Sequence, residues 1–194
     1  MTRTKRILTV SMIVLLALLV GIATHFLWNW WNAKMYPTTY EEIIEIYSEE
    51  YGVPKHLIFS VIKVESGFDP YAESSAGAVG LMQMMPSTFE WLTSAEHLGE
   101  NLSVSRLTDP EVSIRYGTYY LRYLYQKFGN WDVVLAAYNG GEGNVTQWLE
   151  DPECSDELGN LTYIPFKETR NYVKKVNDAI AQYEKLDQAK TERS

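Results

Sequence analysis

The sequence predicts a mainly α-helical domain, with at most a small β-hairpin, preceded by one transmembrane helix. Residues 7–27 are almost unbroken apolar sequence, and apolar residues further along recur at helical spacing. Pro and Gly stand where helices are expected to begin and end, whereas the signals of strands are scarce. We predict an N-terminal stub with a transmembrane anchor at 1–31, a linker at 32–39, one domain at 40–187 and a tail at 188–194.

The N-terminal segment has the pattern of a membrane anchor. About 20 apolar residues suffice to cross a bilayer as a helix, and the run Ile7–Leu27 is long enough. Basic residues, which stay on the cytoplasmic side, precede it, and tryptophans typical of the far interface follow it; these are Arg3, Lys5, Arg6, Trp28, Trp30 and Trp31. We therefore expect a single-pass protein of the cell membrane with its domain on the extracytoplasmic, cell-wall side.

A cleaved signal peptide is the competing interpretation of this segment. Gly21-Ile22-Ala23 offers a cleavage site of the small-x-small type, but apolar Phe26-Leu27-Trp28 continues past it where polar sequence would be expected. The uncleaved anchor is therefore favoured. A lipoprotein is excluded because no cysteine follows the apolar run.

Beyond the linker, the spacing of apolar residues and the positions of Pro and Gly predict a succession of helices. A polar connection is expected at 101–107 and an irregular loop at 151–161, and any hairpin should lie within 70–85. The helices are expected at 40–47 (closed by Gly52), 54–65, from 86 to about 92, 108–128, 131–138, 143–149 and 165–185.

The helix expected at 108–128 has a stripe of aromatic residues that includes Tyr119, Tyr120 and Tyr123. The chain contains 14 Tyr and 6 Trp in all, a load that suits stacking against sugar rings. We interpret the stripe first as a packing surface and second as a sugar platform.

Charge and composition exclude several classes of function. The net charge of −8 argues against nucleic-acid binding, which needs a basic surface. The single Cys154 permits no internal disulfide and no cysteine-based zinc site. His25, His56 and His97 are far apart and lack the spacing of metal ligands. We therefore expect no metal and no cofactor.

Glu65 is the candidate for acid–base chemistry. It ends an apolar helix, and Ser66-Gly67 and Asp69-Pro70 then turn the chain. The negative end of the helix dipole and an apolar surround should both raise the pKa of this carboxyl group. An acid kept protonated near neutrality is what a sugar leaving group requires. The alternative is a solvated residue at a helix end. Asp69, the nearest second carboxylate, is interpreted as a turn-former.

Four short motifs in order give the chain a resemblance to a known family. They are Glu65-Ser66, Gly80-Leu81-Met82-Gln83, Ala137-Tyr138-Asn139, and Ile164-Pro165 with Glu168-Thr169 and Tyr172-Val173. Each is weak alone, but together they resemble the signatures of the soluble lytic transglycosylase (SLT) family, with its goose-type lysozyme-like fold. The resemblance extends roughly from Tyr40 to Tyr183.

The resemblance implies an enzyme that cleaves the β-1,4 bond between MurNAc and GlcNAc in peptidoglycan glycan strands. One Glu protonates the glycosidic oxygen and then, ionised, deprotonates the C6 hydroxyl, which closes a 1,6-anhydro ring without consuming water. The resemblance also implies that the substrate's N-acetyl group stabilises the cationic centre. By position in the motifs, Glu65 corresponds to the acid/base of the family. The residues that correspond to groove-lining positions are Ser74, Gln83, Met85, Tyr138 and Glu168.

The side chains at these positions suit such roles, although alternatives remain. Gln83 offers amide donors and acceptors, and Met85 offers adaptable apolar contact. Tyr138 could instead be a core residue, and Glu168 could simply stabilise the start of the last helix. At the level of the whole chain, a hydrolytic muramidase and a non-catalytic glycan-binding or assembly module remain as alternatives. The sequence identifies no envelope or divisome-type protein partner.

Overall fold

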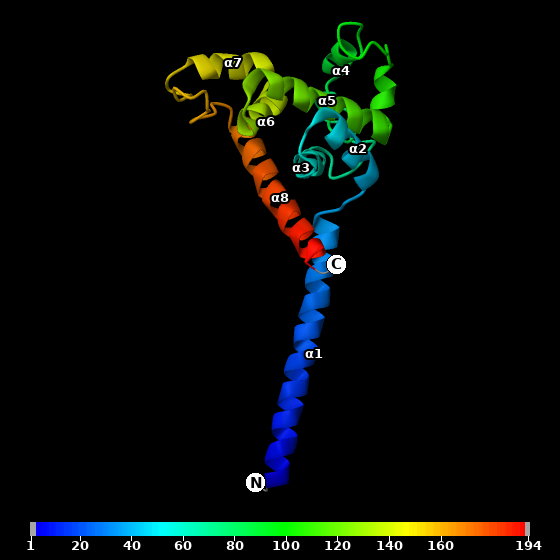
Figure 1. Cartoon of the computed structure of the whole chain (residues 1–194), viewed down its shortest axis with the longest axis vertical. Helices are drawn as coiled ribbons and strands as arrows, with labels where there is room; N and C mark the ends of the chain where they lie inside the picture. Colours follow the sequence, from blue (N-terminus) through cyan, green and yellow to red (C-terminus); the bar gives the residue numbers. More distant parts are fainter. Residues whose placement is uncertain (1–2, 193–194) are drawn as a thin grey trace. The chain divides into compact units, whose positions relative to one another are not determined.

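The computed structural model describes residues 3–192, and the chain divides into two compact units, Met1–Thr38 and Thr39–Ser194. The first two residues of the predicted stub and the last two of the predicted tail lie outside the described residues. Figure 1 shows the elements of both units, which are described separately below.

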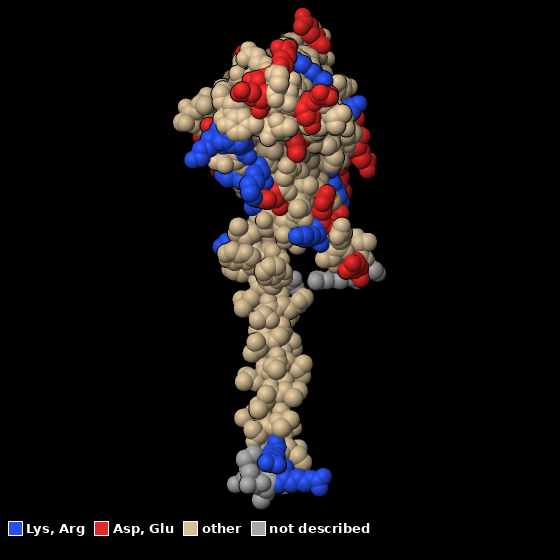
Figure 2. All heavy atoms as spheres, turned by 90° about the vertical axis from the view of Figure 1, so that its left-hand side faces the viewer, with Lys and Arg blue, Asp and Glu red and all other residues tan. Residues whose placement is uncertain are grey.

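The first unit consists mainly of one long helix, α1 (Arg3–Met35). Between Arg6 and Met35 it is long and apolar enough to cross a membrane, and its apolar side chains are exposed. Figure 2 shows an uncharged surface along this helix beyond the basic residues near its start. The helix continues to Met35, so the first four residues of the predicted linker at 32–39 are helical.

The second unit is built from helices, and the part of the chain that the structure describes contains no strand. The mainly helical prediction is therefore confirmed. In order, the elements are α2 (Glu41–Tyr51), α3 (Lys55–Glu65), α4 (Pro86–Leu92), the short 3₁₀ helix η1 (Val104–Thr108), α5 (Pro110–Phe128), α6 (Trp131–Gly140), α7 (Glu142–Glu150) and α8 (Lys167–Thr191).

Side-chain caps and glycines explain where several of these helices begin and end. Asp109 accepts a hydrogen bond from the backbone N–H of Glu111 and so caps α5, in which Pro110 takes the first position. Asn130 caps α6 in the same way. Gly129 ends α5 at a φ of 69°, a left-handed conformation that favours glycine.

The region 70–85 holds only isolated bridges, from Val79 to Glu73 and to Met84, which agrees with a prediction of at most a small hairpin. The structure departs from the prediction in two places. The polar connection at 101–107 contains η1. Helix α8 begins at Lys167 and runs to Thr191, so the described start of the predicted tail is helical.

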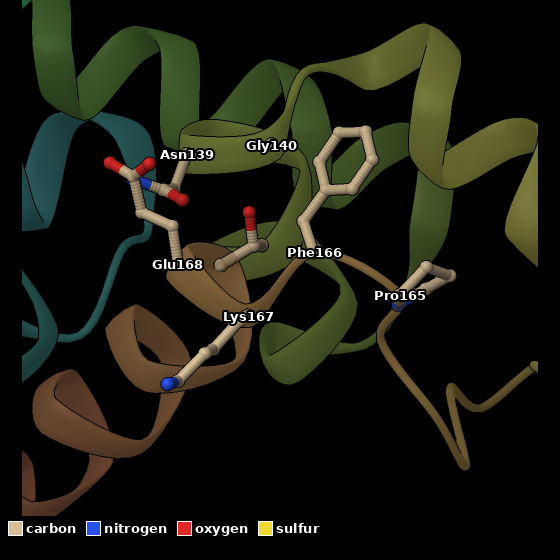
Figure 3. Close-up of a pocket in the computed structure, with 7 residues that line it drawn as sticks. Asn139, Gly140, Pro165, Phe166, Lys167 and Glu168 are labelled. Atoms are coloured by element: carbon tan, nitrogen blue, oxygen red, sulfur yellow. The ribbon is translucent and has the colours of Figure 1, made fainter.

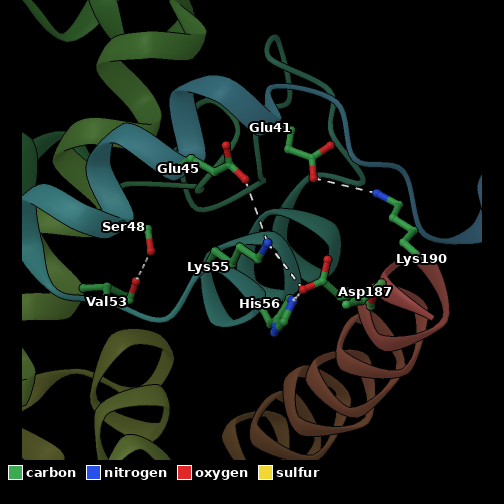
Figure 4. Close-up of polar contacts among 9 residues, drawn as sticks. Glu41, Glu45, Ser48, Val53, Lys55, His56, Asp187 and Lys190 are labelled. Carbon is green, nitrogen blue, oxygen red and sulfur yellow. Dashed lines mark hydrogen bonds and ion pairs between the residues drawn. The ribbon is translucent and has the colours of Figure 1, made fainter. Parts of the chain in front are cut away.

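Helix α3 packs along α8, and this contact positions the site described below. Its central residues, Leu57 to Ile62, are all buried. At the start of α3, the Nε2 atom of His56 and the Nζ atom of Lys55 lie 3.3 and 3.4 Å from the carboxylate of Asp187, near the end of α8 (Figure 4). The two helices therefore run antiparallel, and the end of α3 faces the first turns of α8.

Candidate active site

Glu65 is the last residue of α3. Its pKa is raised to about 7. Burial is the largest cause, a nearby Tyr172 hydroxyl opposes it, and the negative charge of Glu168 adds to it. The predicted rise is confirmed, and the carboxyl group keeps its proton well above the pH at which a solvated Glu loses it.

Two tyrosines from different helices lie beside this carboxyl group. Burial and the charge of Glu65 raise the pKa of both Tyr138 and Tyr172 well above the usual value, so both hydroxyls stay neutral. Tyr138 donates a 2.7 Å hydrogen bond to the carbonyl of Met82. The buried Tyr172 hydroxyl makes no hydrogen bond of standard geometry, yet it lies near enough to favour the ionised form of Glu65. Its motif was recognised in the sequence, but its place beside Glu65 was not predicted.

Ser66 connects the end of α3 to the turn that contains the Gly80-Leu81-Met82-Gln83 motif. Its hydroxyl donates a 2.8 Å hydrogen bond to the carbonyl of Leu81 and accepts one from the N–H of Phe68. The backbone N–H of Met82 donates to Ser113 of α5 at 3.3 Å. Because α3, α5 and α6 all bind this one turn, the motif holds the site together from three sides.

Gly80 occupies a position that no other residue could take without a shift. Its φ is +82°, and a Cβ atom built on it would lie 2.0 Å from the backbone oxygen of Leu107. Close approach of backbone to backbone, together with the left-handed conformation, therefore requires glycine here.

Gln83 lies in the same turn at a φ of 46°, unusual for a residue with a side chain. Its Nε2 atom donates to the carbonyls of Ala72 and Gly80, at 2.9 and 3.0 Å. The two amide hydrogens are therefore used within the loop, and only the side-chain oxygen is left to face a ligand. This corrects the expectation that Gln83 offers both donors and acceptors.

The other two loop residues singled out in the sequence differ in exposure. The Ser74 hydroxyl is half-buried and accepts a 3.0 Å hydrogen bond from the N–H of Ala78. Met85, at the start of α4, is 41% exposed. The Gln83 contact with Ala72 draws the two ends of the loop together.

Glu168 lies in the first turn of α8, exposed, and lines a pocket of about 490 Å³. The end of α6 and the segment before α8 form this pocket: Asn139, Gly140, Pro165, Phe166, Lys167, Glu168 and Thr169. In Figure 3, Glu168 and Asn139 lie on the same side, and Lys167 points away from the other side chains. The negative charge of Glu168 acts on Glu65, so this pocket adjoins the site.

Asp69, the nearest carboxylate in sequence, has a structural task. Its Oδ1 atom accepts a 2.9 Å hydrogen bond from the backbone N–H of Tyr71, and the residue is exposed. The interpretation as a turn-former is confirmed. Within residues 3–192, no group of three or more His, Cys, Asp or Glu side chains is placed to hold a metal ion.

Comparison with known proteins identifies the family. The Transglycosylase SLT domain model matches residues 42–157. The soluble lytic murein transglycosylase of Escherichia coli K12 is 37% identical over 145 residues, which cover 74% of this chain and 22% of that protein. Membrane-bound lytic murein transglycosylase C of Glaesserella parasuis is 30% identical over 165 residues, 74% of this chain and 45% of that protein.

Solved structures agree with this match. The 70 kDa soluble lytic transglycosylase of E. coli has a TM-score of 0.72 and 35% identity, over 80% of this chain and 25% of that one. An inactive Glu-to-Gln mutant of the Pseudomonas aeruginosa lytic transglycosylase Slt has a TM-score of 0.69 and 34% identity, over 78% and 25%. The chain thus spans about a quarter of the length of these soluble relatives, and it belongs to the SLT transglycosylase domain family.

Proposed function

We propose that the Thr39–Ser194 unit is a peptidoglycan lytic transglycosylase in which Glu65 is the acid and then the base. The observation on which the proposal depends is a single carboxyl group, largely withdrawn from water, whose pKa is raised to about 7. Such a group is protonated in much of the population near neutral pH and can still ionise, which suits a residue that must both give and take a proton.

In the first step, Glu65 donates its proton to the glycosidic oxygen that joins MurNAc C1 to GlcNAc C4. The C1–O bond breaks, the GlcNAc chain leaves with a free 4-hydroxyl, and the substrate's N-acetyl group stabilises the cationic centre. In the second step, the carboxylate takes the proton of the MurNAc C6 hydroxyl, and O6 bonds to C1. The product is a 1,6-anhydro end, and Glu65 recovers its proton.

Two observations support a single-carboxylate mechanism over the pair that most glycosidases use. The hydrogen bond from Tyr71 commits Asp69 to a turn. Glu168 is exposed in the first turn of α8, so it is not withdrawn from water as Glu65 is. The Pseudomonas relative, which a Glu-to-Gln change inactivates, is consistent with one essential carboxyl group.

The remaining residues are proposed to bind the glycan. Gln83 would accept a hydrogen bond from an acetamido N–H or a hydroxyl through its free oxygen. Met85 would contact an apolar sugar face or the lactyl group, and Tyr138 would position the reacting sugar. Ser74 and Glu168 would make further polar contacts with the strand. We further propose that α1 anchors the protein in the cytoplasmic membrane as a single span, with the domain on the cell-wall side.

Product analysis tests this function directly. Full-length protein in detergent is incubated with purified peptidoglycan, and the released fragments are examined by mass spectrometry. We expect fragments with 1,6-anhydroMurNAc ends, which are lighter by one water than the reducing ends left by hydrolysis. Reducing ends alone would establish a muramidase, and the absence of turnover would favour a binding module.

A further inference from the structure

A second pocket, of about 480 Å³, lies between the end of α2 and the second half of α5. None of the residues to which the chemistry or the glycan contacts are assigned above lines it. We call it the α2–α5 pocket. Its lining residues come from the two helices and the turn after α2: Glu49, Glu50, Tyr51, Gly52, Tyr119, Arg122 and Gln126.

Two tyrosine rings give the α2–α5 pocket a fixed apolar surface. The rings of Tyr51 and Tyr119 meet edge to face, with their centroids 5.5 Å apart, and both residues are half-buried. The hydroxyl of Tyr51 accepts a 3.3 Å hydrogen bond from Nε of Arg115, and the hydroxyl of Tyr119 lies 3.3 Å from Nδ1 of His97. Because neighbouring side chains hold both rings, a ligand does not have to order them when it binds.

The α2 side of the pocket is negative. Glu49 and Glu50 are exposed carboxylates in the last turn of α2, which Gly52 closes. The carbonyl groups at the end of a helix add negative partial charge at the same place. An ammonium group is therefore the favoured occupant of this side of the pocket.

The α5 side of the pocket is positive, because Arg122 is half-buried there. Within residues 3–192, its guanidinium group forms no ion pair and no hydrogen bond, although Glu49 and Glu50 line the same pocket. Arg115 of the same helix, in contrast, pairs with Glu100 at 2.8 Å. A guanidinium group has five N–H donors in a planar fork that matches a carboxylate. The pocket thus holds opposite charges that do not neutralise each other.

We propose that the α2–α5 pocket binds the zwitterionic end of a cell-wall peptide, with its ammonium group beside Glu49 and Glu50 and its carboxylate on Arg122. The choice of occupant rests on the function proposed above, because peptidoglycan carries short peptides on its lactyl groups. A diaminopimelate residue in such a peptide ends in a carbon that bears both an ammonium group and a carboxylate. Its methylene chain packs against the two tyrosine rings. This contact holds the domain on the wall separately from the glycan at Glu65.

Binding of a synthetic peptide tests the proposal in the absence of any glycan. The probe is the tripeptide L-Ala-γ-D-Glu-meso-diaminopimelate, and Kd is measured by calorimetry with the full-length chain in detergent. We expect Arg122→Gln to weaken binding by ~3- to 30-fold, the range for one partly exposed, charge-assisted contact. The double change Glu49→Gln and Glu50→Gln should weaken binding to a similar degree. The same tripeptide with its ammonium groups acetylated should bind less tightly to the wild type.

Lys127→Gln is the matched control, because Lys127 is a cation of the same helix that pairs with Glu142 outside the pocket. Its affinity for the tripeptide should equal that of the wild type. Glu49 and Glu50 are exposed, so their double variant keeps the test decisive if Arg122→Gln does not fold. The proposal is overturned if the wild type does not bind the tripeptide, or if Arg122→Gln and the double variant both bind it as tightly as the wild type.

The two proposals fail in different ways. A wild-type protein that releases no anhydro-ended fragments, but loses affinity for the tripeptide on Arg122→Gln, would refute the transglycosylase and leave the pocket as a peptide-binding site. A protein that releases anhydro-ended fragments and does not bind the tripeptide would refute only the peptide site.

Discussion

The hydroxyl of Tyr138 donates a 2.7 Å hydrogen bond to the backbone carbonyl of Met82. This bond joins the end of α6 to the turn that Ser66 joins to the end of α3. Glu65 lies at that same helix end, so the bond between two motifs distant in sequence holds Tyr138 beside the candidate acid.

Tyr138→Phe should therefore lower both stability and turnover. Loss of the hydroxyl leaves the Met82 carbonyl without its partner, which costs ~1–3 kcal/mol. The free energy of unfolding is measured by urea denaturation, with Tyr71→Phe as control because Tyr71 is 77% exposed. Equal unfolding midpoints for the two variants would mean that the bond contributes nothing.

Gly80→Ala and Gly77→Ala form a matched pair. Both glycines have a positive φ, +82° and +85°, so each alanine meets the same backbone strain of ~1–2 kcal/mol. A Cβ atom at Gly80 collides with the Leu107 carbonyl, whereas nothing lies within 4 Å of one at Gly77. We expect Gly80→Ala to be less stable by a further ~1–3 kcal/mol, measured by the same denaturation. A smaller loss at Gly80 than at Gly77 would contradict the close approach described here.

The sequence was sufficient to predict those features of the fold and the site that depend on local signals. The helix predicted at 108–128 agrees with α5 to within two residues, and the end of an apolar helix at Glu65 indicated both its position and the direction of its pKa shift. The four motifs were sufficient to identify the family, because their order along the chain is specific even though each motif is short.

Contacts between distant segments could not be predicted from those signals. The amide hydrogens of Gln83 bind Ala72 and Gly80 because the loop closes on itself. Tyr172 reaches Glu65 only because α8 packs antiparallel to α3. The region 70–85, where at most a small hairpin was predicted, has only isolated bridges, and side chains such as Ser66 and Gln83 hold the loop.

The raised pKa of Glu65 should make the folded domain less stable as pH rises. The folded state keeps the proton up to about pH 7, whereas the unfolded chain releases it near 4.5. The contribution of the neutral carboxyl is therefore complete below pH 4.5 and is lost as pH rises through 7. Glu65→Gln, which cannot ionise, should have a higher Tm than wild type at pH 8 and lose that advantage at pH 4. An identical Tm difference at both values would contradict the shift.

Tyr172→Phe should move the pH dependence of activity. The Tyr172 hydroxyl favours the ionised form of Glu65, so its removal should raise the pKa of that carboxyl still further. The alkaline limb of kcat/KM, which reports the acid of the free enzyme, should shift to higher pH. Tyr163→Phe is the control, since Tyr163 is 51% exposed in the segment before α8. An unchanged limb, or a shift to lower pH, would show that the hydroxyl does not act on Glu65.

The central claim is that Glu65 alone supplies the proton, and the rate at which 1,6-anhydro-ended fragments form from peptidoglycan tests it most directly. General acid–base catalysis contributes ~10²–10⁴-fold, so folded Glu65→Gln should be slower by at least ~100-fold. Glu168→Gln should lose less, because that residue is proposed only to position the strand, and Asp69→Asn should act mainly on stability. A folded Glu65→Gln variant with a near wild-type rate, or a folded Asp69→Asn variant that is equally inactive, would contradict the single-carboxylate mechanism.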